Sequence, residues 1–510
     1  MSTPRQTIPS SRSFQSPFAS SRIGRWLDAL AYGRALPLAT AALFAVVWGP
    51  RFARSFWVDE AGTFWMVREG LFSAVRKTWH WPGQSILYSA IASFFCFDGT
   101  ALRDVLLRIP SLLGIAAAAH FLYRIAERSI GDRAGLVTVI LFLFHPGVTE
   151  VGYQARPYAL AMAAVAASCW ALSEWESSRR RIHLLHYMGA SVLVIYLHYF
   201  FAVILAVHAL YLLFVFFVEG RRQRWGEAVL AGAGILLCVV PLIPHLQLMA
   251  GERHKALQYL RPPGLLDLTN FLAPSLLVAG LVAAGCLLLF FRPAHLHGRT
   301  RLDPAFLFLL MAWWLVGPSL FMAVSRAPAI RIFVERYLSF SYPAQALLFT
   351  CLGYRLFGAA GARVWALAGV VLFAANPLLV RGAGRGKDDL MPVIQLIRAE
   401  AKAPVFFPSL LAESQFYDWR AGNHADSYLF APLVAYPIDN PVLPLPFKPT
   451  AESWEYVGER LDSQLRGTSE VLFVGYQGRW EEGILERMQL AGFHATVREL
   501  GNFTLYVFRR

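Results

Sequence analysis

The sequence carries little charge for its length. Only 16% of its 510 residues are Asp, Glu, Lys or Arg, whereas 56% are hydrophobic, and the mean hydropathy is +0.45. A chain of this composition cannot cover its surface with polar groups, which excludes an ordinary water-soluble protein. The net charge of +14 lies in short clusters between apolar runs, so it does not indicate a nucleic-acid partner.

Paired cysteines, a cleavable leader and internal repeats are also missing. The five cysteines all lie in apolar stretches without paired spacing, which indicates neither disulfides nor a metal site. Residues 1–34 are rich in Ser, Pro and Arg and have no apolar core before a cleavage site, so we predict a disordered basic cytoplasmic tail. No internal repeat points to an inverted-repeat transporter.

Long apolar runs are abundant instead. Runs of about 15 to 22 residues recur along the first three quarters of the chain, and each is long enough to cross about 30 Å of hydrocarbon as a helix. We expect a mainly α, polytopic membrane protein with about eleven transmembrane helices. They lie at roughly 35–50, 106–126, 134–147, 157–174, 184–197, 199–218, 227–247, 271–291, 303–324, 337–356 and 363–380.

The basic clusters set the expected orientation. They fall in alternate short loops, which the positive-inside rule places in the cytoplasm with the N-terminal tail. Residues 51–105 then form a long outer loop within the membrane domain 35–380, and the short apolar stretch Ile86–Phe97 lies along the outer interface. An odd number of spans puts residues 381–510 outside the inner membrane.

The last 130 or so residues have the composition of a soluble domain. A helix is expected from Asp388 to about Glu400, and others near 451–466 and 480–491. Strand-like runs interleave with them, so we predict a small extracytoplasmic α/β domain. These runs are Val405–Phe407, Val471–Gly475 and Phe503–Phe508.

Two adjacent carboxylates, Asp59 and Glu60, follow the first span among aromatic residues. Carboxylates beside a membrane cost desolvation energy unless they have partners or a chemical task. Two interpretations remain open: a helix N-terminal cap, which acidic residues favour, or an active site.

Arg156 precedes Pro157 and an Ala- and Leu-rich run, which predicts a helix with Pro157 in its first turn. A cation at the positive end of a helix does not stabilise that helix, but it would help to bind an anion such as phosphate. The alternative is an arginine that extends to lipid head groups.

Several motifs, taken in order, resemble one known group of proteins. They are Trp57-Val-Asp59-Glu60, His80-Trp-Pro82-Gly-Gln84-Ser-Ile-Leu-Tyr88, Leu107-Arg108-Ile-Pro110-Ser111-Leu-Leu-Gly114, Tyr153-Gln154-Ala-Arg156-Pro157-Tyr158, Leu197-His198-Tyr199-Phe200 and Glu335-Arg336-Tyr337-Leu338. Over roughly residues 40–380 the series resembles the bacterial protein mannosyltransferase and aminoarabinose transferase superfamily, family-39-like membrane glycosyltransferases of the C-type fold.

The resemblance implies a polyprenyl-phosphate sugar donor, an active site at the outer membrane face and inversion at the anomeric carbon. It implies that Asp59 is the catalytic base, with Glu60 beside it. An inverting transfer also needs a cation for the departing phosphate, which Arg156 supplies. The candidate site residues are Asp59 and Glu60 for catalysis; Arg156, Arg336 and Tyr158 for the donor phosphate; and His80, Gln84, Tyr88, Tyr153, Gln154, His198, Tyr199 and Tyr337 for substrate.

The chain departs from the family where members often have Gln-Glu-Ala-Arg, because Tyr153-Gln154-Ala155-Arg156 lacks the glutamate. Glu150 lies one helical turn earlier and could replace it. With Glu60 and His198, and with His80 on the same side, Glu150 could form a divalent-metal site, or the histidines could be structural. No cofactor is certain, and a divalent metal ion remains an option.

The sequence thus predicts an inverting transferase that moves a sugar from a polyprenyl-phosphate donor to a glycan, lipid or protein acceptor. Membrane lipids are its surroundings, and nucleic acid is not a partner. Two other classes stay open, a transporter or flippase of lipid-linked sugars and a non-catalytic membrane scaffold. A transporter should carry charged residues at the midplane of several spans, whereas here they gather at one face.

Overall fold

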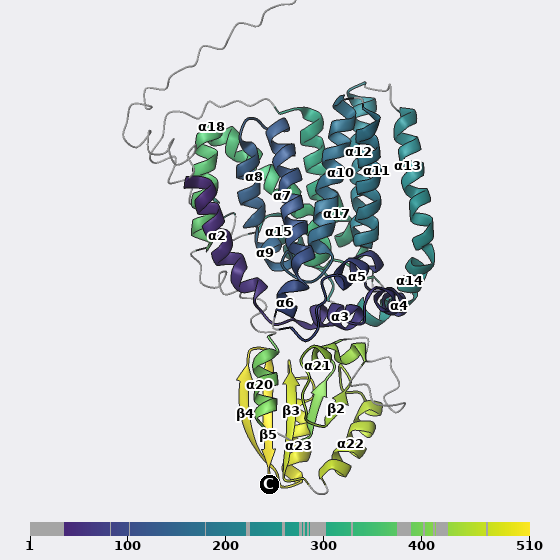
Figure 1. Cartoon of the computed structure of the whole chain (residues 1–510), viewed down its shortest axis with the longest axis vertical. Coiled ribbons are helices and arrows are strands. Elements are labelled where there is room, and N and C mark those ends of the chain that lie inside the picture. Colours follow the sequence, from purple (N-terminus) through teal and green to yellow (C-terminus); the bar gives the residue numbers. More distant parts are fainter. Residues whose placement is uncertain are drawn as a thin grey trace, which may run out of the picture.

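A computed structural model of the chain has two parts, a helical unit (35–374) and a smaller sheet unit (389–510) placed end to end (Figure 1). The predicted tail 1–34 and the linker 381–388 lie outside the described residues. The structure describes 35–81, 83–100, 102–178, 180–220, 225–257, 261–274, 278, 281–282, 285, 302–327, 330–374, 389–400, 403–411, 414, 427–465 and 468–510.

The helical unit is built from upright helices that follow the apolar runs of the sequence (Figure 1). Helix starts carry the expected signals, as in α17, where Asp303 accepts a hydrogen bond from the Ala305 amide and Pro304 is the first residue. The longer helices are α2 (Ala35–Phe52), α7 (Ile109–Ser129), α8 (Ala134–Leu143), α10 (Tyr158–Ser178), α11 (Arg181–Leu197), α12 (Ile204–Leu213), α13 (Trp225–Val239), α14 (Ile243–Leu257), α17 (Pro304–Val324) and α18 (Tyr342–Ala374).

Small residues allow these helices to approach closely. A Cβ atom at Gly114 of α7 would lie 2.6 Å from the backbone of Ala159 and Leu160 in α10. Helices in lipid gain little from burying apolar surface against each other, so they depend on this kind of close packing. Gly358 interrupts α18 with a φ of 67°, and the two predicted spans 337–356 and 363–380 meet at this break.

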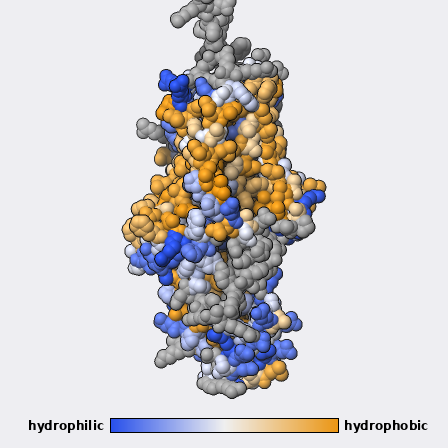
Figure 2. Space-filling view, turned by 90° about the vertical axis from the view of Figure 1, so that its right-hand side faces the viewer, coloured by the Kyte–Doolittle hydropathy of each residue, from blue (hydrophilic) through white to orange (hydrophobic). Residues whose placement is uncertain are grey.

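Four helical segments in the described part of the chain are long and apolar enough to cross a membrane: Arg103–Ser129, Tyr199–Val218, Trp225–Gly251 and Pro304–Val324. Shorter apolar helices are Leu36–Phe52, Ala134–Leu143, Arg181–Leu197 and Gly361–Val371. The eighth expected span, 271–291, falls largely outside the described residues, and the count of eleven stays a prediction. Figure 2 shows hydrophobic residues over most of the helical unit, a surface that needs lipid.

The long loop 51–105 folds at the end of the helical unit that faces the sheet unit (Figure 1). It forms four short helices, α3 (Val58–Val67), α4 (Leu71–His80), α5 (Ile86–Ser93) and α6 (Arg103–Leu106). With eight residues, α5 is about 12 Å long and too short to cross a bilayer. The loop is therefore a folded layer between the long helices and the sheet unit.

The sheet unit has five strands in the order β2-β1-β3-β5-β4. β1 (Val405–Pro408) is parallel to β2 (Val442–Leu445) and β3 (Glu470–Tyr476), whereas β5 (Phe503–Arg509) is antiparallel to β3 and to β4 (His494–Leu500). Its helices include α20 (Met391–Ala399), α22 (Ala451–Leu465) and α23 (Glu481–Leu490). The α/β fold class and the three expected strands are confirmed; β2 and β4 were not predicted.

The two units meet where α21 (Ala431–Ala435) and the short helix η9 (Tyr428–Phe430) pack on α3. The Tyr436 hydroxyl accepts a hydrogen bond from the Phe56 amide and donates one to Asp104. Arg103 donates to the Ala435 carbonyl oxygen at 2.6 Å and lies over the ring of Tyr436. Polar bonds thus fasten the sheet unit to the loop that holds Asp59.

Candidate active site

The two adjacent carboxylates of α3 have different surroundings. The Glu60 carboxylate is buried and forms a paired contact with the Arg108 guanidinium, with both distances 2.7 Å. It also accepts hydrogen bonds from the Ala155 and Trp57 amides, while Arg108 donates to the carbonyl oxygens of Phe52 and Arg54. Glu60 therefore joins three segments through contacts that can stabilise the fold, and its predicted catalytic role stays a prediction.

Asp59 lies in the first turn of α3 and keeps 17% of its side chain exposed. Its Oδ2 atom lies 3.8 Å from Nη2 of Arg336, which comes from the 3₁₀ helix η6 (Glu335–Ser341). The guanidinium of Arg336 also lies over the rings of Trp57 and Tyr337. The carboxylate that sequence analysis chose as the base is thus accessible and faces a cation.

Arg156 lies beside the same carboxylate, just before α10. Its Nη1 donates to the Gln84 side-chain oxygen and, at 3.4 Å, to the Asp59 carbonyl oxygen. Burial is the largest influence on the pKa of Arg156 and lowers it, but Asp59 and the neighbouring tyrosines together outweigh burial, so the net pKa is raised; the same holds for Arg336. Both guanidinium groups stay charged at any physiological pH.

Three buried nitrogen atoms of this cluster have no hydrogen-bond partner among the described residues. The Nε atoms of Arg156 and Arg336 and Nδ1 of His198 are buried and make no hydrogen bond to any residue that the structure describes. Such donors are costly unless a ligand or water satisfies them. Arg336 lies near the Asp59 carboxylate and Arg156 bonds to the Asp59 main-chain oxygen, so two cations with open donors are placed where they can hold an anion next to an accessible carboxylate.

Aromatic rings line the cluster. His198, in the turn between α11 and η2 (Tyr199–Val203), lies with its ring centre 5.3 Å from that of Tyr158 and 5.8 Å from that of Tyr337. Burial, together with the charges of Arg156 and Arg336, lowers the pKa of His198 to about 3, so the imidazole is neutral at physiological pH. The structure therefore brings together seven predicted site residues: Asp59, Gln84, Arg156, Tyr158, His198, Arg336 and Tyr337.

Other predicted residues have separate roles. His80 is exposed and bonds to the Arg76 carbonyl oxygen, and Tyr199 bonds to His245. Tyr153 is buried against Phe52 and Arg108. The remaining two, Tyr88 and Gln154, are buried beneath the site, and the Gln154 side chain donates to the Glu150 carbonyl oxygen.

The predicted metal site is not assembled. Among the described residues, no group of three or more His, Cys, Asp or Glu side chains could hold a metal ion. Glu60 has both oxygens engaged in the pair with Arg108. The proposed ligand set of Glu60, Glu150 and His198 therefore does not form.

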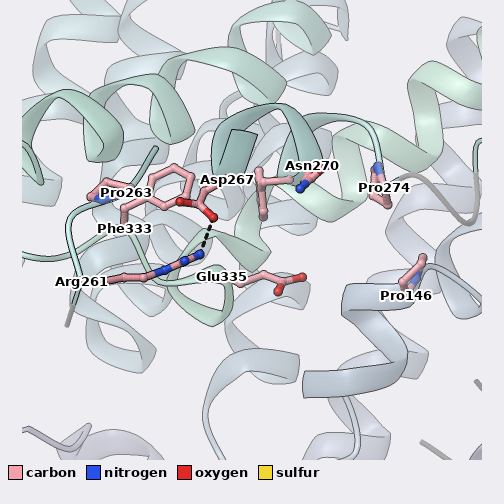
Figure 3. Close-up of a pocket in the computed structure, with 9 residues that line it drawn as sticks. Pro146, Arg261, Pro263, Asp267, Asn270, Pro274, Phe333 and Glu335 are labelled. Carbon is pink, nitrogen blue, oxygen red and sulfur yellow. Dashed lines mark hydrogen bonds and ion pairs between the residues drawn. The ribbon is translucent and has the colours of Figure 1, made fainter. Parts of the chain in front are cut away.

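A cavity of about 490 Å³ is lined in part by Glu335 at the start of η6 (Figure 3). Arg261, before α15 (Leu265–Leu272), and Asp267 and Asn270 within it line the cavity, and the Arg261 and Asp267 side chains form an ion pair at 2.7 Å. Glu335 points into it from η6, next in sequence to Arg336. One short element thus supplies Arg336 and Tyr337 to the cluster and Glu335 to the cavity.

Sequence reasoning missed two residues of the site. Arg108 lies in one of the motifs, but nothing in the sequence indicates that its partner is Glu60 rather than Asp59. Tyr428 of the sheet unit accepts a hydrogen bond from the Gln84 amide at 3.1 Å and packs on Trp65 and Trp81. No local pattern around residue 428 signals this contact, which arises from the docking of the two units.

Comparison with known proteins gives two matches. Residues 87–247 match the family described as dolichyl-phosphate-mannose-protein mannosyltransferase. The fold is similar to that of ArnT from Cupriavidus metallidurans with undecaprenyl phosphate bound, at 11% identity and a TM-score of 0.54, over 92% of this chain and 97% of ArnT.

The apo form of the same protein gives 12% identity and a TM-score of 0.53, over 96% of this chain and 98% of that one. No curated protein matches the sequence. The match in sequence over 87–247 and the match in fold over nearly the whole chain agree. They confirm the predicted resemblance to multi-pass membrane glycosyltransferases of the C-type fold.

Proposed function

We infer that this membrane glycosyltransferase of the C-type fold transfers a sugar from a polyprenyl phosphate to an acceptor hydroxyl, with inversion, in the cluster around Asp59. The observation that carries the proposal is the placement of an accessible carboxylate beside two charged guanidinium groups that have open buried donors. The ArnT structure that shares the fold holds undecaprenyl phosphate, which is why we choose a polyprenyl-phosphate donor.

The reaction follows from the charges. The Asp59 carboxylate takes the proton of the acceptor hydroxyl, whose oxygen then attacks the anomeric carbon on the face opposite the phosphate. The bond between that carbon and the phosphate oxygen breaks, and its electron pair goes to the phosphate. Arg156 and Arg336 stabilise the negative charge that develops there, which is where preformed cations are most effective.

The orientation of the membrane domain belongs to the same proposal. The basic clusters of the short loops favour a cytoplasmic N-terminus, so the cluster and the sheet unit would face the outside of the inner membrane. A lipid-linked donor would then enter from the membrane, and a glycan, lipid or protein acceptor would approach from the outer side. Sugar and acceptor identities are left to experiment.

A transporter of lipid-linked sugars is the second candidate. Within the described residues, the buried charged side chains are Arg51, Glu60, Arg108, Arg156 and Arg363. Four of them lie at the end of the helical unit that carries the cluster, and Arg363 bonds to the Arg133 carbonyl oxygen between α7 and α8. This distribution favours chemistry at one face over a charged pathway through the midplane.

The test compares transfer of radiolabelled sugar from polyprenyl-phosphate donors by membranes that contain wild type, Asp59→Asn or Arg156→Ala. We expect Asp59→Asn to lower the rate by about 10²–10⁴-fold, as for loss of a general base, while undecaprenyl phosphate still binds. Arg156→Ala should weaken both binding and transfer, with a rate loss of about 10²–10³-fold.

Asp98→Asn is the matched control, because Asp98 is an exposed carboxylate of the same loop that bonds to the Gly99 amide next to it. It should transfer sugar at the wild-type rate. If wild type transfers no label from any donor, yet moves lipid-linked sugar across the membrane and Asp59→Asn does the same, the transporter interpretation replaces the transferase.

A further inference from the structure

We propose that Tyr428 of the sheet unit is a positioning residue for the donor phosphate, acting through Gln84 on Arg156. The inference rests on the proposed function and extends it, because it makes the C-terminal unit part of the donor site. Tyr428 is 6% exposed and begins η9, the segment that leads into the docking helix α21.

The contacts form a short relay. The Tyr428 hydroxyl oxygen accepts a hydrogen bond from Nε2 of Gln84 at 3.1 Å, and Oε1 of the same amide accepts from Nη1 of Arg156. All three side chains are buried to nine-tenths or more. The relay thus links the sheet unit to the guanidinium group whose Nε atom lacks a described protein partner.

The chemistry of the groups fixes the direction of the relay. A guanidinium group can only donate hydrogen bonds, so it must face the oxygen of the Gln84 amide. The amide nitrogen must then point to the other side, where the Tyr428 hydroxyl accepts its hydrogen. When both bonds of the Gln84 side-chain amide are made, Arg156 has one favoured position. Without the bond to Tyr428, the amide can rotate and turn its NH₂ group, a donor, toward the Arg156 cation.

Packing holds the Tyr428 ring in place. Its centre lies 4.5 Å from that of the Trp81 ring and 5.6 Å from that of Trp65. A Cβ atom at Gly62 would lie 2.9 Å from the Tyr428 ring. Because Gly62 lies three residues after Asp59 on α3, the ring packs on nearly the same helix face that carries the proposed base.

A purely structural role is the competing explanation, because the sheet unit needs residues to dock. Docking already has its own bonds, which join Tyr436 to Phe56 and Asp104, and Arg103 to Ala435. Those bonds hold the same segment to Phe56, just before α3, and to α6, without a bond to Gln84. They therefore supply a matched control in which a tyrosine hydroxyl is lost from the same interface.

The experiment uses the full-length protein in lipid nanodiscs and measures binding of undecaprenyl phosphate, and transfer where the donor is known. Tyr428→Phe removes the hydroxyl and keeps the ring. Loss of one buried hydrogen-bond partner should weaken binding and raise the donor KM by about ten-fold, with kcat nearly unchanged. Tyr436→Phe should leave both quantities at the wild-type value.

A double-mutant cycle separates positioning from docking. In a Gln84→Ala background the relay is already cut, so Tyr428→Phe should weaken binding no further. The inference is overturned if Tyr428→Phe binds undecaprenyl phosphate like wild type, if its effect persists in full in the Gln84→Ala background, or if Tyr436→Phe causes an equal loss. Failure of the proposed function looks different, since wild type itself would then bind no undecaprenyl phosphate and transfer no sugar.

Discussion

At the scale of single residues, the site depends on a contrast between two neighbouring carboxylates. Asp59 is accessible and lies beside cations that have open donors, whereas every described contact of Glu60 is to the protein interior. Two carboxylates one position apart on a helix thus have different surroundings, and we propose a chemical role for Asp59 and a structural role for Glu60. Their side chains point about 100° apart around the helix axis.

We predict that Glu60→Gln destabilises the protein by about 3–5 kcal/mol, because it leaves the buried Arg108 cation without its counter-charge. Thermal unfolding in detergent measures the effect. Glu69→Gln is the control, since Glu69 is 47% exposed and its pair with Lys77 lies at the surface, where such pairs contribute about 0–1 kcal/mol. Equal unfolding temperatures for both variants would contradict a structural role for Glu60.

The sequence identified most of the cluster because the motifs of a resembling family are short and stand at element ends. Asp59, Arg156 and Arg336 come from segments far apart in the chain, and only their order suggested that they meet. The sequence could not identify the partner of Glu60, because tertiary packing decides which cation a carboxylate contacts. The contact between Tyr428 and Gln84 could not be predicted for the same reason, because it depends on how the two units dock.

At the scale of elements, η6 supplies residues to both the cluster and the cavity of Figure 3. Arg336 faces Asp59, and Glu335 faces the cavity. An acceptor held in the cavity would lie beside the short helix that also carries Arg336. We therefore predict that the cavity admits the acceptor, and that a larger side chain there blocks it.

Asn270→Trp would fill much of the cavity from α15. We expect the acceptor KM to rise by about ten-fold or more, because a lost or displaced substrate contact costs roughly 1–3 kcal/mol. Binding of undecaprenyl phosphate should not change. Weaker binding of that lipid in Asn270→Trp, with an unaltered acceptor KM, would assign the cavity to the donor.

Elements were predictable where their periodicity was strong. The apolar runs gave the long helices to within a few residues, and the apolar strands β1, β3 and β5 were found. The two others lack that signal: β4 is polar and almost wholly exposed at the sheet edge, and β2 includes Pro444. Helix α10 begins at Tyr158, so Pro157 precedes it and contributes a carbonyl oxygen to its first turn.

At the scale of the whole molecule, the proposal requires one orientation in the membrane. The sheet unit should lie on the outer side of the cell membrane, and the loop between α10 and α11 should lie on its cytoplasmic side. In a cysteine-free background, Gln489→Cys on α23 should react with a membrane-impermeant maleimide in spheroplasts, while Arg181→Cys should react only after lysis; both positions are exposed. The reverse pattern would invert the topology and move the site to the cytoplasm.

The bond between Tyr436 and the Phe56 amide joins residues 380 positions apart in the chain. Ribosomes make and insert the helices of the membrane unit long before they reach this tyrosine. At that stage the chain already contains Asp59, Arg156 and Arg336 but lacks Tyr428, which bonds to Gln84 beside Arg156. If the proposed function is right, the donor site is completed only after the last 130 or so residues have been synthesised and folded.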